Sequence, residues 1–189
     1  MTSKTSAPVE PQPAPGLPNA SGELANSTFP LLKNNLPSFP IIGIGASAGG
    51  LAAFESFFSG LPKDVETGMA FVLVQHLAPD HKSMLPELIR RYTPMPVYEV
   101  EDSMAVTPNC VYIISPNHDM ALLNGSLQLL EPTAPRGQRL PIDFFFRSLA
   151  ADQHERAIGI VLSGTGSDGT LGVRAIKSAG GMVMAQTPD

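Results

Sequence analysis

Residues 40–50, PIIGIGASAGG, decide the fold of this chain. A β-branched run ends abruptly at small residues, and residues 51–58 then carry apolar side chains at helical spacing. This order predicts a buried strand, a tight turn and the start of a helix, with the hydroxyl of Ser47 at the turn. Glycines in such a turn let the backbone bend sharply and let another group approach closely.

Two motifs overlap in this turn and predict different chemistry. GASAG, residues 45–49, fits the G-x-S-x-G elbow that holds a serine nucleophile out of a sheet. GIGASA, residues 43–48, fits the G-x-G-x-x-A variant of a dinucleotide-binding turn equally well. The rest of the chain has to distinguish between them.

Composition limits the class of protein. The chain has 189 residues, 43% of them hydrophobic, which is enough for one sizeable α/β domain and a tail. Its net charge of −5 argues against a nucleic-acid partner, and no apolar run approaches the roughly 20 residues that would insert into a membrane. Cys110 is the single cysteine, which excludes an intrachain disulfide and indicates a reducing, cytoplasmic location.

Residues 1–37 differ from the rest of the chain. They are rich in Pro, Ser, Ala and Asn and show no apolar periodicity. Closely spaced prolines prevent helices and central strands, so this part is predicted to be a disordered tail or linker. The folded domain is expected to span residues 38–189.

Apolar runs along residues 38–189 alternate between strands and helices. Buried strands are predicted at the start of the domain and at residues 69–74, 157–162 and 182–185, with shorter ones at 96–100 and 111–114. Helices are expected at residues 51–58, 83–91, 141–150 and 171–179, and Asn124-Gly125 marks a hairpin. The fold class is therefore α/β: a doubly wound, mostly parallel sheet with helices on both faces (three layers, αβα) and an antiparallel hairpin insertion.

Three polar side chains follow predicted strands: Ser47, His76 and Asp168. In an open parallel sheet, ligands bind outside the carboxyl ends of the strands. A hydroxyl, an imidazole and a carboxylate that meet there are the parts of an activated nucleophile. Each also has a simpler explanation: Ser47 as the N-cap of a helix, His76 as a backbone-bonded strand end, and Asp168 as a turn residue or the cap of the next helix. Their joint position favours the catalytic interpretation.

The order of these residues weakens the two general alternatives. A dinucleotide site needs an acidic residue at the end of the second strand, where this chain has Gln75 and His76. An α/β-hydrolase has the chain order Ser, Asp, His, whereas the order here is Ser, His, Asp.

Four segments together resemble one known family. They are residues 45–50 (GASAGG), 75–76 (QH), 115–118 (SPNH) and 162–169 (LSGTGSDG). The combination is similar to the catalytic domain of the CheB-type chemotaxis protein-glutamate methylesterases and extends over residues 39–189. Residues 139–150 (RLPIDFFFRSLA) are most like the version fused to a CheR-type methyltransferase and PAS domains.

The resemblance implies a function and a site. Family members hydrolyse glutamyl methyl esters on chemoreceptors to glutamate and methanol, and some deamidate glutamine. By that resemblance the triad is Ser47, His76 and Asp168, and the backbone of Ala48 and Thr165 contributes to the oxyanion hole. No cofactor and no metal is expected. The implied partners are methylated chemoreceptor helices or a related signalling protein, with a CheR-type methyltransferase as a further candidate.

Several departures from the family keep a second interpretation open. Ala48 stands where many members have Thr, and Thr165 where many have Met, although backbone roles tolerate both changes. Residues 1–37 lack the pattern of a receiver domain, and the domain is expected to be truncated at its C-terminus. The alternative is a non-catalytic sensory or scaffold module of a fusion signalling protein.

Overall fold

The central feature of the fold is a six-stranded sheet in which every neighbouring pair of strands is parallel. The computed structural model describes residues 38–47, 50–75, 84–135, 137–162 and 166–187. Within these residues the strand order is β3-β5-β2-β1-β8-β9. The strands are β1 (Ile41–Ala46), β2 (Ala70–Gln75), β3 (Val97–Glu99), β5 (Val111–Ile113), β8 (Ala157–Val161) and β9 (Met182–Ala185).

The two central strands are buried along their whole length. Every residue of β1 and β2 is buried, which explains why their sequences are continuously apolar rather than alternating. Their register runs from Ile41 opposite Ala70 to Ala46 opposite Gln75. The predicted buried strands at the start of the domain and at 69–74 are therefore confirmed, and both end at the same level of the sheet.

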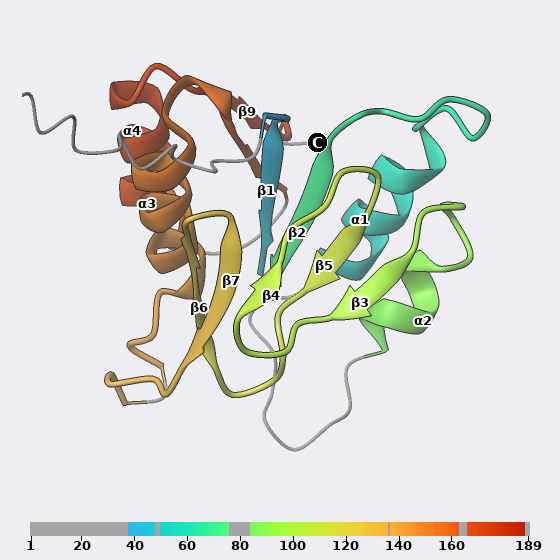
Figure 1. The fold of residues 1–189 in the computed structure, drawn as a ribbon. Helices are drawn as coiled ribbons and strands as arrows, with labels where there is room; N and C mark the ends of the chain where they lie inside the picture. Colours follow the sequence, from blue (N-terminus) through green and yellow to red (C-terminus); the bar gives the residue numbers. More distant parts are fainter. Residues whose placement is uncertain (1–37, 48–49, 76–83, 136, 163–165, 188–189) are drawn as a thin grey trace, which may run out of the picture. The chain divides into compact units, whose positions relative to one another are not determined.

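Helices cover both faces of the sheet, as predicted (Figure 1). On one face, α1 (Gly50–Ser59) contributes Phe54 and Phe58 to a core cluster shared with α2 (Leu85–Ile89). On the other, α3 (Pro141–Gln153) contributes Phe145 and Phe146 to a second cluster, against which α4 (Thr170–Ser178) packs. The expected αβα layering is correct.

The antiparallel insertion forms a small sheet with the strand order β4-β7-β6. Its strands are β4 (Met104–Ala105), β6 (Asp119–Leu123) and β7 (Ser126–Leu130). Asn124 and Gly125 join β6 to β7 with φ values of 51° and 74°, the left-handed conformations that a tight hairpin turn requires. Met120, Leu122 and Leu127 of this sheet belong to the α3 core cluster, so the insertion packs over α3 rather than standing alone.

A few helix boundaries differ from the predicted ones. The helix expected at 83–91 is confined to Leu85–Ile89 and begins after Met84, while Ser83, its expected N-cap, lies outside the described residues. Helix α3 extends to Gln153, beyond the predicted end at 150. A single turn of 3₁₀ helix, His154–Arg156, then leads into β8.

Two glycines of β1 are required by the packing of α3. A Cβ added to Gly45 would lie 2.4 Å from Cγ2 of Ile142, and one added to Gly43 would lie 2.9 Å from Cε1 of Phe146. Helix α3 thus lies directly on the backbone of β1, and the space over both glycines is filled by the protein itself. The dinucleotide motif assigns Gly43 to a tight turn and Gly45 to the close approach of a pyrophosphate, whereas both accommodate a helix here.

At the edge of the sheet, β9 leaves Met182 and Met184 substantially exposed. No helix among the described residues is both long enough and apolar enough to cross a bilayer.

Gly45→Ala is expected to lower the free energy of unfolding by about 1–3 kcal/mol, because the added methyl collides with the β-branched side chain of Ile142. Urea denaturation measures the difference. Gly60→Ala is the matched control, since the nearest atoms to its added Cβ are backbone oxygens at 3.5 Å. Equal stability of the two variants would contradict the close packing of α3 on β1.

Candidate functional site

Ser47 leaves the sheet directly after β1, at the carboxyl end of the strand. It is half-buried, and its carbonyl oxygen accepts a hydrogen bond of 3.0 Å from the amide of Gly50, the first residue of α1. The predicted strand–turn–helix arrangement is therefore present. The serine lies in the turn, where a nucleophile of an α/β fold is expected.

Of the other residues that the family resemblance assigns to the site, the structure describes only some. Gln75, the last residue of β2, pairs in register with Ala46, the residue before Ser47. His76 comes next in the sequence but lies outside the described residues, as do Ala48 and Thr165, the two expected contributors to the oxyanion hole.

Asp168 lies in the turn before α4, and its carboxylate binds the N-terminus of α3. Its Oδ2 accepts a hydrogen bond of 3.0 Å from the amide of Ile142, and its Oδ1 accepts one of 2.8 Å from the amide of Asp143. An ionised carboxylate can accept about four hydrogen bonds, so these two contacts are compatible with a further contact to an imidazole. The arrangement fixes both the position and the rotation of the carboxylate.

The local sequence explains why α3 takes a cap from elsewhere in the chain. Pro141 at the first helical position has no amide hydrogen, and Leu140 before it has no side-chain acceptor. The next two amides of α3 consequently bind Asp168, whose negative charge suits the positive end of the helix dipole. Asp168 thus caps α3, a helix distant in sequence, while the N-cap position of α4, the helix that follows it, is Gly169.

A small polar pocket of about 70 Å³ lies beside this arrangement. Gln75 of β2, Asp119 of β6 and Arg139 before α3 are among the residues that line it. Arg139 is held by two hydrogen bonds, from Nε to the carbonyl of Ala134 (3.0 Å) and from Nη1 to Oδ1 of Asn117 (2.9 Å). The pocket therefore presents a fixed guanidinium next to the carboxyl ends of the central strands.

Burial raises the pKa of the Asp119 carboxyl above its ordinary value. The positive charge of Arg139 opposes this rise, and the negative charge of Asp168 adds to it. Two carboxyl groups from distant parts of the sequence therefore interact at this end of the sheet. Neither Asp119 nor Arg139 belongs to the triad predicted from the sequence, because a charged residue before a hairpin or a helix is usually only solvated.

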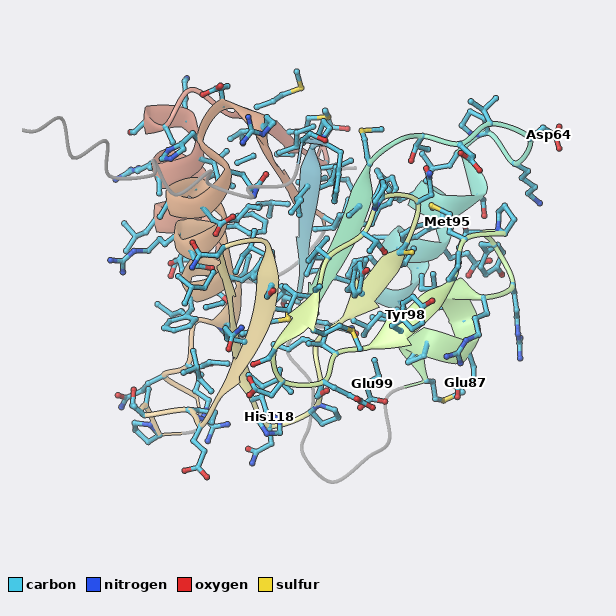
Figure 2. The ribbon with its side chains drawn as sticks, viewed as in Figure 1. Asp64, Glu87, Met95, Tyr98, Glu99 and His118 are labelled. Carbon is cyan, nitrogen blue, oxygen red and sulfur yellow. The ribbon has the colours of Figure 1, made fainter. Side chains whose placement is uncertain are left out.

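The structure also describes His118, which is among the residues that line the polar pocket, and Cys110. The Nδ1 atom of His118 lies 2.8 Å from the carbonyl oxygen of Pro116, a contact within its own turn, and the side chain is exposed (Figure 2). Cys110 is buried and reduced. Among the described residues, no cluster of three or more His, Cys, Asp or Glu side chains could bind a metal ion.

Asp168→Ala is expected to lower the free energy of unfolding by about 1–2 kcal/mol, because two amides of α3 lose their acceptor. Thermal or urea denaturation measures this loss. Asp64→Ala is the control, since Asp64 is exposed and lies at the end of the molecule away from His118 (Figure 2). A loss no larger than that of the control would mean that the cap does not stabilise α3.

Asp119→Asn is expected to stabilise the protein more at pH 7.5 than at pH 4. A carboxyl whose pKa is raised by folding stabilises the folded state while protonated and loses that contribution as the pH rises through the folded pKa. The asparagine does not titrate, so the difference in unfolding free energy between variant and wild type should grow with pH. The effect is modest because the side chain is partly exposed. Urea denaturation at both pH values tests this, and a constant difference would contradict it.

Comparison with known proteins identifies the class. The sequence pattern of the family described as CheB methylesterase matches residues 42–189. The fold resembles the crystal structure of the Thermotoga maritima CheB methylesterase catalytic domain with a TM-score of 0.68 and 29% sequence identity, covering 77% of this chain and 78% of that one. The chain therefore belongs to the CheB methylesterase family.

Individual relatives cover different lengths. A protein-glutamate methylesterase/protein-glutamine glutaminase of Photorhabdus laumondii is 33% identical over 85% of this chain and 46% of its own length. The corresponding protein of Escherichia coli is 30% identical over 80% of this chain and 44% of its own length. An uncharacterized 104.1 kDa protein of Rhodobacter capsulatus is 47% identical over 55% of this chain but only 11% of its own length. The chain thus spans less than half the length of these relatives.

Proposed function

We propose that this domain is a serine esterase that hydrolyses glutamyl methyl esters on a signalling protein, releasing methanol. The observation that carries the proposal is the match to the CheB methylesterase family over residues 42–189, which includes all three expected triad positions. It is supported by the turn that holds Ser47 and by the anchored carboxylate of Asp168.

Each residue has a defined role in this mechanism. The hydroxyl of Ser47 attacks the ester carbonyl while His76 accepts its proton, and His76 then returns the proton to the departing methoxide. Asp168 keeps the imidazole in the correct tautomer and stabilises its protonated form. The amides of Ala48 and Thr165 stabilise the oxyanion of the tetrahedral intermediate. Water then hydrolyses the acyl-enzyme by the same steps, and no cofactor takes part.

The biological setting is part of the proposal. The substrates are methylated chemoreceptor helices, located in the cytoplasm, and glutamine deamidation is a second activity, as the names of the Photorhabdus and Escherichia relatives suggest. We further propose that the domain, residues 38–189, belongs to a larger protein with a CheR-type methyltransferase. The match covers only 11% of the 104.1 kDa Rhodobacter relative, which supports the larger size but not the identity of the further domains.

Ser47→Ala is expected to abolish turnover, since removing a triad nucleophile costs on the order of 10⁶-fold in a comparable enzyme. The assay is methanol release from a chemoreceptor cytoplasmic fragment that carries glutamyl methyl esters, together with hydrolysis of p-nitrophenyl acetate. The ester reagent reports on the serine even if the receptor fragment is not the natural substrate.

Ser56→Ala on the exposed side of α1 is the matched control and should retain full activity. Residual activity of Ser47→Ala within tenfold of wild type would exclude the serine mechanism. A wild-type protein inactive toward both substrates would favour the non-catalytic scaffold.

A further inference from the structure

Two aspartates connect the helices α3 and α4 by capping each other's helix. Asp168, just before α4, accepts hydrogen bonds from two amides of α3. Asp143, in the first turn of α3, accepts a hydrogen bond of 2.7 Å at Oδ1 from the amide of Gly172, in the first turn of α4. The backbone amide of Asp143 is itself one of the two donors to Asp168. Each carboxylate thus satisfies amides that have no acceptor within their own helix.

We propose that Asp143 is a positioning residue that holds the carboxylate of Asp168 in its catalytic place. The inference rests on the proposed function, because it assigns to Asp168 the role of orienting His76. Asp143 has no catalytic step of its own. It acts by fixing the first turn of α4. Because residues 168–169 lead directly into that helix, their position is fixed as well.

The burial of Asp143 supports a positioning role. Its side chain is 5% exposed, so the carboxylate is committed to the contact with Gly172 rather than to solvent. Loss of its oxygen would leave the Gly172 amide buried without its acceptor, and that amide can regain a partner only if the first turn of α4 moves.

The packing around this contact leaves little room for adjustment. A Cβ added to Gly172 would lie 2.5 Å from Cβ of Phe146, and one added to Gly169 would lie 3.2 Å from Cγ2 of Ile142. Gly169 also has φ 97°, a conformation that fixes the direction in which the chain leaves Asp168. The turn that carries Asp168 is therefore packed directly against α3, and a shift of α4 displaces it.

The electrostatics agree with this role. Asp143 lies in the first helical turn of α3 and bonds to an amide in the first turn of α4, two places where negative charge is favourable. The charged side chain that the Asp143 amide contacts is Asp168, from the turn before α4. Backbone amides of α3 thus hold the carboxylate of Asp168, and Asp143 fixes the position of α4 relative to α3.

The test compares Asp143→Ala with Asp152→Ala in p-nitrophenyl acetate hydrolysis by the full chain. Asp152 is a matched control: it is a carboxylate on the same helix, 8% exposed, and its Oδ2 accepts a hydrogen bond from the Gly125 amide, away from Asp168. Asp143→Ala should lower kcat by about 10–100-fold with KM within twofold, because a small displacement of an orienting group is costly. Asp152→Ala should leave both constants within twofold.

Two further readouts distinguish positioning from general destabilisation. Asp143→Asn retains a side-chain oxygen for Gly172 and should recover most of kcat. In the Asp168→Ala background, Asp143→Ala should cause no further loss, because the group through which it acts is already absent. If Asp143→Ala does not fold, Asp143→Glu is measured instead. The longer glutamate side chain cannot place its carboxylate on the Gly172 amide without moving α4, so the same loss of kcat is expected.

The inference is overturned if Asp143→Ala, or the variant that replaces it, lowers kcat no more than Asp152→Ala does. It is also overturned if Asp143→Ala lowers kcat by the same factor in the wild-type and the Asp168→Ala backgrounds. Ser47→Ala and Asp168→Ala, measured in the same assay, distinguish a failure of the proposed mechanism from a failure of the positioning role. If those two variants remain active, the proposed mechanism fails. If both lose most of their activity and Asp143→Ala is normal, only the positioning role fails.

Discussion

The close contact between α3 and the backbone of β1 is the constraint on which the described domain depends. Gly43 and Gly45 themselves carry no side chain on that face of β1, and Ile142, Phe145, Phe146 and Leu149 fill the space over them. A larger residue at either position would force side chains of α3, or the helix itself, to shift. This contact also fixes the N-terminus of α3, because Ile142 both packs on Gly45 and donates its amide to Asp168. Core packing and site geometry are therefore parts of one arrangement.

Carboxylates organise the end of the domain where the central strands finish. Asp168 and Asp143 bind helix amides, whereas Asp119 faces the guanidinium of Arg139 and the charge of Asp168. The first two are stabilised by donors at short distance, and the third carries the cost of partial burial. The proposed esterase mechanism needs one carboxylate in a fixed orientation, and backbone amides provide a rigid means to hold it.

Local patterns predicted the turns in which Ser47 and Asp168 lie. The turn after β1 places Ser47 where the glycine-rich motif predicted it, and Asp168 lies in the expected turn before α4. The contact partners could not be predicted. Asp168 was interpreted as a possible cap of the helix that follows it, yet it caps a helix that begins 27 residues earlier in the chain, at Pro141. The sequence patterns did not single out Asp143.

The sequence by itself determined the alternation of apolar runs, and with it the parallel sheet, the helices on both faces and the Asn124-Gly125 hairpin. Those features follow from periodicity and turn chemistry, which act over a few residues. Only the tertiary structure decided what Gly43 and Gly45 are for, and which amides Asp143 and Asp168 bind. A glycine leaves space that either a ligand or a helix can fill, and a carboxylate can accept hydrogen bonds from many different donors. The choice depends on segments that are distant in the chain and meet only when the core packs.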